Sequence, residues 1–145
     1  EIHSGDWSSD VCSSDLRIPV VGNGGIAERD DAECMMRETG VDGVMIGQAA
    51  IGRPWIFREL LQNTEPPVSA GERCKVIERH LRGLRDLLVR SGQDRDRAER
   101  KACSAGRVHL AGYLRGIRGR RDLMRRLQRV RRVEEMLEEV RRTVD

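Results

Sequence analysis

Aromatic side chains are scarce in this sequence. Phenylalanine, tyrosine and tryptophan together make up 3% of its 145 residues. A protein that recognises nucleic acid by stacking bases needs an aromatic platform, so the composition argues against that mode of recognition. No run of about eighteen apolar residues is present either, which argues against a membrane-spanning helix.

Cysteines are few, and their spacing is uninformative for metal or disulfide chemistry. None of the four stands in a C-x-x-C arrangement, so we expect neither a disulfide framework nor a zinc site. Cys34, Cys74 and Cys103 fall in helical patterns and are expected to be small, buried or partly buried residues. The composition is typical of a soluble cytoplasmic protein, and we expect a monomer without a bound metal.

The first sixteen residues show no periodicity. They lack the basic start and apolar core of a signal peptide. The segment Asp6–Leu16 resembles one reading frame of a widely used sequencing adapter. We therefore expect residues 1–16 to be non-native and set them aside, the alternative being a disordered polar tail.

Residues 18–57 show the pattern of a βαβ unit. Ile18–Val21 is a β-branched run that suits a parallel strand buried on both faces, and Gly43–Ile46 is a second such run. Between them lies a helical pattern that we expect to end at Gly40. Each strand is followed by a glycine turn, Asn23-Gly24-Gly25 after the first and Gly47-Gln48 after the second.

The two glycine turns suggest an anion site. Adjacent parallel strands end side by side, and each leads into a helix whose first N–H groups lack partners. Glycine lets a ligand approach the backbone, and (β/α)8 barrels often hold a phosphate on the loops after their last two strands. The alternative is that these glycines only make tight turns between strand and helix.

Three runs of residues resemble one enzyme family. They are VGNGGI at 21–26, DGVMIG at 42–47 and GRPWIF at 52–57, and they are similar to the tRNA-dihydrouridine synthases. The resemblance implies a flavin enzyme that reduces uridine in tRNA with FMN and NADPH. It also implies that the FMN phosphate is held by Asn23, Gly24, Gly25, Gly47 and Gln48. Relatives usually have arginine at the position of Gln48, so the prediction rests more on the backbone N–H groups than on the Gln48 side chain.

The resemblance predicts an α/β fold, namely the C-terminal part of a flavin (β/α)8 TIM barrel followed by an all-α four-helix bundle. About 129 residues follow the segment set aside, whereas a complete barrel needs on the order of 250. We therefore expect a fragment, with strands 7 and 8 in residues 17–63, a linker at 64–69 and a helical tRNA-binding domain at 70–145. The family's catalytic cysteine would lie in an earlier barrel segment, so we assign no catalytic residue, and we expect the fragment alone to be inactive.

The second half of the sequence is helical in pattern. Ser69 is an expected N-cap, with Glu72 three residues later. The apolar spacing predicts four helices. The first ends near residue 92, the second spans about 94–114, the third follows Gly119 and the fourth starts near Val133. In the second of these helices we expect one inward face, made by Ala98, Ala102, Ala105 and His109.

Charge is divided unevenly along the chain. Residues 1–69 carry a net charge of −7 and residues 70–145 a net charge of +10. Residues 107–132 hold ten arginines against one acid, Asp122. Five of these arginines recur at spacings of three and four, which predicts one helical face: Arg118, Arg121, Arg125, Arg129 and Arg132. The face is either a solvated basic surface or a track of phosphate contacts for RNA.

The run from Arg107 to Gly116 resembles the helical-domain signature of the same family. His109 and Tyr113 are four residues apart and share a helix face. His109 is either a tRNA contact or a hydrogen-bonded packing residue. The predicted RNA-binding residues are Arg107, His109, Tyr113, Arg115, Arg118, Arg121 and Arg125.

Three functions remain in competition. The favoured one is a fragment of an FMN-dependent tRNA-dihydrouridine synthase. The others are a different flavin or phosphate-binding barrel enzyme, and a non-catalytic RNA-binding helical module with a vestigial βαβ unit. Flavin binding separates the first from the third.

Overall fold

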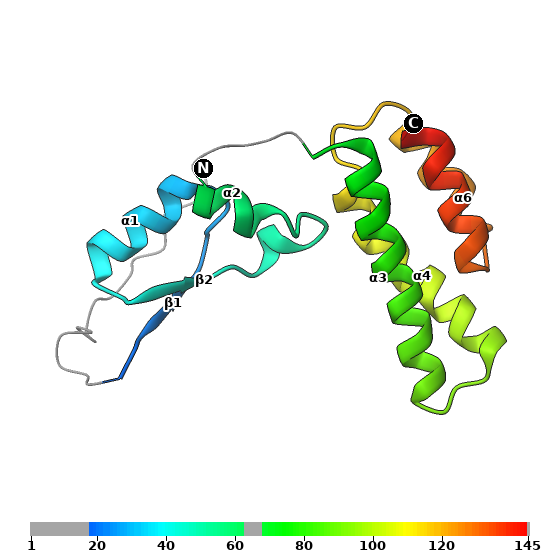
Figure 1. Ribbon diagram of the computed structural model, residues 1–145, viewed down its shortest axis with the longest axis horizontal. Coiled ribbons are helices and arrows are strands. Elements are labelled where there is room, and N and C mark those ends of the chain that lie inside the picture. The colour runs from blue at the N-terminus through cyan, green and yellow to red at the C-terminus, as the bar shows by residue number, and fades with distance from the viewer. Residues whose placement is uncertain (1–17, 63–67, 145) are drawn as a thin grey trace. The chain divides into compact units, whose positions relative to one another are not determined.

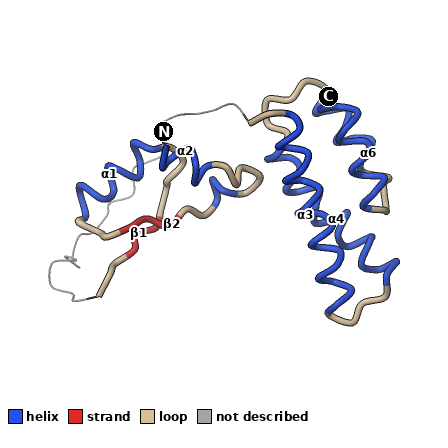
Figure 2. Tube along the Cα trace, viewed as in Figure 1, coloured by secondary structure: helices blue, strands red, loops and turns tan. Residues whose placement is uncertain are grey.

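The computed structural model describes residues 18–62 and 68–144. The expected non-native segment 1–16 lies outside the described residues, as does most of the expected linker 64–69. The chain divides into two compact units, residues 1–50 with 54–65 and residues 51–53 with 66–145. The described part is predominantly helical with one small parallel sheet, and its strands belong to the first unit alone (Figure 2).

The first unit is a βαβ unit followed by two short helical segments. Its elements in chain order are β1 (Val21–Asn23), α1 (Arg29–Thr39), β2 (Gly43–Met45), the 3₁₀ turn η2 (Gln48–Ala50) and α2 (Ile56–Gln62). The two strands pair in parallel, with Val21 opposite Gly43 and Asn23 opposite Met45 (Figure 1). The α/β character expected from the sequence is therefore present.

Helix α1 covers β1 and ends as the sequence predicts. A Cβ at Gly22 would lie 2.6 Å from the Sδ of Met35, which shows how closely α1 packs on the strand. Gly40 adopts the left-handed conformation (φ 68°), and its N–H donates to the Met36 carbonyl at 3.0 Å. Glycine has no Cβ to oppose that conformation, so it stops the helix there.

The first strand begins later than expected. Ile18 lies before the ladder and is 67% exposed, because β2 starts at Gly43 and offers nothing opposite Ile18. In the described residues Val21 is 60% and Met45 51% exposed, so the burial on both faces that such a run suits is not present here. A parallel strand is buried by neighbours on each side, and the described sheet has two strands only.

The described residues of the second unit form four helices. They are α3 (Ala70–Arg90), α4 (Arg95–Tyr113), α5 (Arg120–Leu127) and α6 (Val133–Val144). The Ser69 hydroxyl accepts a hydrogen bond from the Glu72 N–H at 3.1 Å, which confirms the predicted N-cap. Asp94 caps α4 in the same way through the Arg97 N–H at 2.9 Å.

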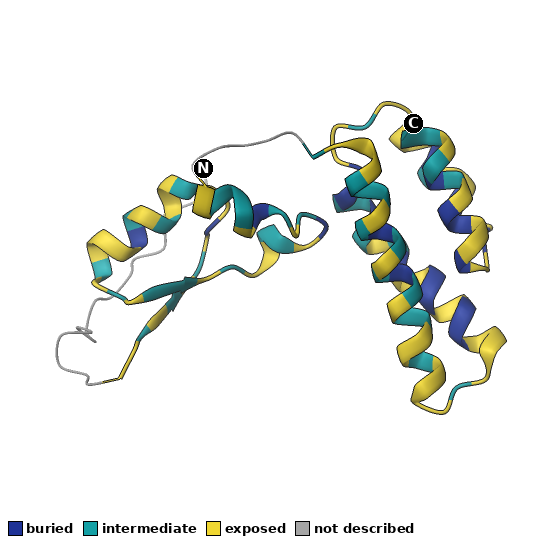
Figure 3. Ribbon diagram, viewed as in Figure 1, coloured by how far each residue is buried: buried dark blue, intermediate teal, exposed yellow. Residues whose placement is uncertain are grey.

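Each of the four described helices of this unit carries buried apolar residues, and Figure 3 colours the buried positions along the ribbon dark blue. Helix α4 contributes Ala98 and Ala102, both fully buried, as expected. Ala105 was expected beside them and is exposed instead. The inward face of α4 continues through Gly106 and Leu110. Leu81 of α3 packs so closely against position 106 that a glycine fits there best.

One carboxylate is buried in this unit. Glu99 of α4 is 6% exposed, and its Oε2 accepts a hydrogen bond from the Val133 N–H at 2.7 Å. Its Oε1 lies 3.8 Å from an Nη of Arg85 on α3. Glu99 therefore caps the first turn of α6 from another helix, which satisfies an N–H that α6 itself leaves without a partner.

Candidate functional site

The two predicted glycine turns lie at the same edge of the sheet. Because Asn23 is opposite Met45, the chain leaves β1 at Gly24-Gly25 beside the point where it leaves β2 at Gly47-Gln48. A Cβ built at Gly25 or at Gly47 would meet no atom within 4 Å. The backbone of both turns is therefore open to a ligand.

The distribution of charge favours an anion near η2 over one near the start of α1. The Asp31 carboxylate accepts from the N–H groups of Ala27 and Glu28, both at 2.9 Å, and Asp30 adds a second negative charge to the first turn of α1. Anions are repelled from such a helix start. The first turn of η2 carries no acidic residue, and Gln48 there is exposed. These residues fit a phosphate held by backbone N–H groups and the Gln48 amide.

In the second unit, the predicted signature centres on a cluster of three rings. The Tyr113 side chain is buried, with 6% exposure, and its hydroxyl lies 3.0 Å from Nδ1 of His80 on α3. The His80 ring centroid lies 4.6 Å from that of His109 and 5.9 Å from that of Tyr113. Burial, and then the charge of His109, lower the pKa of His80, while burial raises the pKa of Tyr113.

His80 was missed by the sequence analysis. The spacing of four residues between His109 and Tyr113 is visible within one helix, but nothing in the sequence pairs that helix with a residue 33 positions earlier. Arg73 of α3 was missed for the same reason, and its guanidinium donates to the Tyr113 carbonyl. Two side chains of α3 thus hold the last turn of α4.

The predicted arginines are exposed but do not share one helical face. Arg118 precedes α5, while Arg129 and Arg132 lie in the connection between α5 and α6, so only Arg121 and Arg125 stand on a common helix. Gly116 and Gly119 explain the break, because both adopt positive φ (80° and 78°) between α4 and α5. The expectation of a continuous stripe was therefore wrong.

The arginines differ in what they contact. Arg125 pairs with Asp122 at 3.2 Å, and Arg107 donates to the Leu127 carbonyl at 3.3 Å. Within residues 18–62 and 68–144, no carboxylate pairs with Arg115, Arg118 or Arg121. These three exposed side chains follow the end of α4 closely in sequence, and we refer to them together as the α4–α5 basic surface.

Comparison with known proteins decides the family. A family model described as dihydrouridine synthase matches residues 7–145, nearly the whole chain. The chain belongs to the dihydrouridine synthase family. The resemblance seen in the sequence is thereby confirmed. The match begins inside the segment 1–16, whose non-native origin stays a prediction.

Curated members of the dihydrouridine synthase family are similar over much of this chain. A probable tRNA-dihydrouridine synthase of Mycobacterium leprae is 36% identical over 124 residues, which are 82% of this chain and 30% of the relative. The tRNA-dihydrouridine synthase B of Shewanella oneidensis is 38% identical over 104 residues, 68% of this chain and 30% of the relative. The chain thus spans about a third of the length of these relatives.

Within residues 18–62 and 68–144, none of the helices is both long enough and apolar enough to cross a bilayer.

Proposed function

We propose that this chain is part of a tRNA-dihydrouridine synthase, which reduces uridine in tRNA to 5,6-dihydrouridine with FMN as cofactor and NADPH as reductant. The observation that carries the proposal is the α4–α5 basic surface in a chain of this family. Arg115, Arg118 and Arg121 are exposed and have no carboxylate partner among the described residues. A polyanion such as tRNA supplies the missing negative charge.

The division of the work between the units is also proposed. Residues 17–63 would complete a (β/α)8 barrel as its last two strands, which accounts for the exposed apolar side chains of Val21 and Met45. Residues 70–145 would form a four-helix bundle that binds tRNA. We also propose that the protein is a cytoplasmic monomer, which agrees with a tRNA substrate.

The FMN phosphate would be held by the turns at the carboxyl edge of the sheet. The residues are Asn23, Gly24, Gly25, Gly47 and Gln48, and the open space over Gly25 and Gly47 supports them. When bound, FMN supplies the hydride that reduces the uracil ring. Gln48 gives an amide donor in place of a charged side chain, so backbone N–H groups would carry most of the phosphate binding, above all those at the turn that leads into η2, where no acidic residue stands.

Two groups of residues would serve tRNA differently. Arg115, Arg118, Arg121 and Arg125 are exposed and would contact phosphates directly. Tyr113 is buried and would act by fixing the end of α4. His109 and Arg107 are half-buried, and each would both contact tRNA and help to hold the end of α4. The arginines would therefore provide the affinity for tRNA, and the ring cluster would hold the end of α4 in position.

Replacing all three arginines of the α4–α5 basic surface with glutamine tests the proposal. Each lost phosphate contact removes about 0.7–0.9 from the slope of log affinity against log salt concentration. The triple variant should therefore bind tRNA more weakly, with a slope shallower by about 2–3 units. Fluorescence anisotropy with labelled tRNA between 50 and 200 mM salt, roughly the range over which such contacts are most visible, measures both quantities.

A matched control changes three arginines of α3 and α4 to glutamine, namely Arg79, Arg97 and Arg100, which are likewise exposed and without a carboxylate partner among the described residues but lie outside 115–121. The net charge falls equally, so the control should keep most of the slope. Equal losses in the two variants, or an affinity of the parent chain that does not change with salt, would contradict the proposal. Flavin retained by a longer chain that contains this one would exclude a non-catalytic RNA-binding module.

A further inference from the structure

The segment Ile51–Arg53 packs against the last turn of α4. It belongs to the second unit, although the chain before and after it belongs to the first. A Cβ built at Gly52 would lie 2.5 Å from the Cα of Gly112, and a Cβ built at Gly112 would lie 2.7 Å from the carbonyl oxygen of Ile51. The two backbones therefore touch each other directly, with a glycine on each side of the contact.

Each of these glycines stands in a run that the sequence analysis singled out. Gly52 is the first residue of GRPWIF at 52–57, and Gly112 lies in the run from Arg107 to Gly116. No role was assigned to either glycine. Gly52 is buried and has a positive φ of 71°, which glycine adopts without strain. The contact explains why neither position has room for a side chain.

One hydrogen bond connects this contact to Arg115. The Gly112 carbonyl accepts from the Arg115 N–H at 3.0 Å, and a Cβ at Gly52 would lie 2.7 Å from the carbon of that carbonyl. The next carbonyl, that of Tyr113, accepts from the Arg73 guanidinium. The backbone directly after α4 therefore starts from two peptide groups whose positions are set by their neighbours.

We propose that Gly52 and Gly112 are positioning residues for tRNA binding. By allowing the segment 51–53 to pack on α4, they fix the start of the connection 114–119, which carries Arg115 and Arg118. A long side chain can absorb a small displacement through its own rotamers. A loosened connection, however, must be ordered when RNA binds, and that ordering weakens the binding. The inference rests on the proposed function and deepens it.

Two substitutions disturb the contact from its two sides, and each has a matched control. Gly112→Ala is compared with Gly83→Ala, a helical position at which a Cβ meets nothing within 4 Å. Gly52→Ala is compared with Gly92→Ala, because Gly92 also has a positive φ (88°) and open space at its Cβ. Alanine at 52 and at 92 is therefore strained alike, and only the variant at 52 also meets another backbone.

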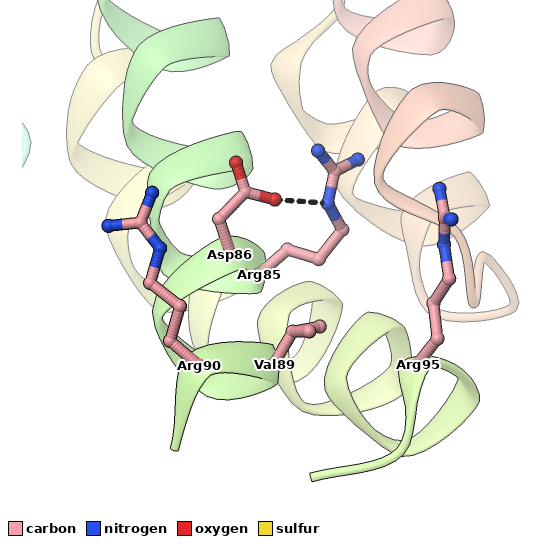
Figure 4. Close-up of a pocket in the computed structure, with 5 residues that line it drawn as sticks. All are labelled: Arg85, Asp86, Val89, Arg90 and Arg95. Atoms are coloured by element: carbon pink, nitrogen blue, oxygen red, sulfur yellow. Dashed lines mark hydrogen bonds and ion pairs between the residues drawn. The ribbon is translucent and has the colours of Figure 1, made fainter. Parts of the chain in front are cut away.

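None of the four substitutions changes a charge. Gly92 lies in the connection between α3 and α4, and Figure 4 shows Arg90 and Arg95 on the two helix ends that this connection joins. These arginines, and all those that follow α4, are kept in every glycine variant. Circular dichroism checks that the helices remain folded. Should Gly112→Ala not fold, Gly52→Ala makes the same test from a position outside the helices.

Hydrogen exchange followed by NMR tests the positioning itself. The Arg115 amide should exchange faster in Gly52→Ala and Gly112→Ala than in the parent chain, because the acceptor of its hydrogen bond is displaced. In the two controls it should exchange as in the parent, and the amides in the middle of α3 should stay protected in all variants. Unchanged exchange at Arg115 in both test variants would overturn the inference.

Labelled tRNA tests the consequence for binding. We expect Gly52→Ala and Gly112→Ala to weaken binding roughly tenfold, the scale of ordering one or two interface side chains, and the controls to change it little. In an R115Q/R118Q background the same glycine substitutions should have little further effect, because the arginines through which they act are gone. A merely structural role would weaken binding equally in both backgrounds, and that result would contradict the inference.

The same measurements separate this inference from the proposed function. If R115Q/R118Q weakens tRNA binding and the two glycine variants do not, the proposed function stands and the inference is wrong. If R115Q/R118Q binds tRNA as tightly as the parent chain, the proposed function loses its support, and the inference falls with it.

Discussion

His80 is the residue on which the ring cluster depends. Its ring contacts His109 and shares a hydrogen bond with the Tyr113 hydroxyl, and both partners belong to α4. Burial disfavours a charged imidazolium at His80, and the neighbouring His109 adds to that effect, so the pKa of His80 is lowered. The charged neighbours of His80 on α3 are themselves paired with α6, as Arg82 with Glu134 and Glu78 with Arg141.

This environment predicts a loss of stability on acidification. Since the folded pKa of His80 is below its ordinary value of 6.5, the unfolded chain binds more protons as the pH falls below 6.5. The free energy of unfolding should therefore decrease below pH 6.5 and be insensitive to His80 above it. Urea unfolding at about pH 7.5, 6.5 and 5.5, followed by circular dichroism, measures this change.

His80→Asn is the matched variant for that measurement. The asparagine oxygen stands near the position of Nδ1 and accepts from Tyr113, but it takes up no proton, so the acid-induced loss should become smaller. Tyr113→Phe keeps the histidine and removes the hydrogen bond, which should cost about 1 kcal/mol at every pH. An unchanged pH dependence in His80→Asn would show that other groups cause it.

At the scale of elements, the contact between α3 and α4 depends on one glycine. A Cβ at Gly106 of α4 would overlap the Cδ2 of Leu81, which is 1% exposed, so the leucine side chain would have to shift within the packed core. Gly83 of α3 is exposed, and a Cβ there would meet nothing within 4 Å. The two helical glycines therefore differ in function, although the sequence presents them alike.

Alanine substitutions should separate these two glycines. Gly83→Ala should stabilise the chain by about 0.5–1 kcal/mol, because glycine is the weaker helix former. Gly106→Ala gains the same propensity but overpacks the core at a cost of about 1–3 kcal/mol, so its net effect should be destabilising. Midpoints of thermal or urea unfolding measure both changes, and stabilisation by Gly106→Ala would show that α3 and α4 can separate without loss.

The elements also show what the sequence was able to predict. Helices with clear apolar spacing and side-chain caps were placed to within a residue or two, as with Ser69 before α3 and Asp94 before α4. The start of β1 was misplaced, since a strand is bounded by its partner and the run from Ile18 says nothing about where β2 begins. The arginine stripe failed because spacing alone does not reveal that Gly116 and Gly119 turn the chain.

The candidate site was predicted in its local parts only. The glycine turns follow from strand and turn chemistry that neighbouring residues determine. The contacts of Tyr113 with His80 and of Arg85 with Glu134 join residues 33 and 49 positions apart, and these depend on how the helices pack. Such pairs have no signature in a single sequence.

At the scale of the whole molecule, the two units should differ in stability. The first unit exposes Val21, Met45, Phe57 and Leu61 at 60%, 51%, 49% and 83%, whereas the second buries apolar side chains from all four helices. Hydrogen exchange should therefore be fast for the amides of β1 and β2 and slow for the middle of α3 and α4. Mass spectrometry of peptides from both units measures this, and strong protection of both strands in the isolated chain would contradict it.

Glu99 also ties α6 to α4. The first turn of α6 takes a cap from α4, through the hydrogen bond from the Val133 N–H to a carboxylate 34 residues earlier in the chain. We expect a chain cut before Val133 to lose this hydrogen bond and to keep Arg85 as the charge near Glu99. Helix α6 therefore contributes an electrostatic contact to this unit as well as apolar packing.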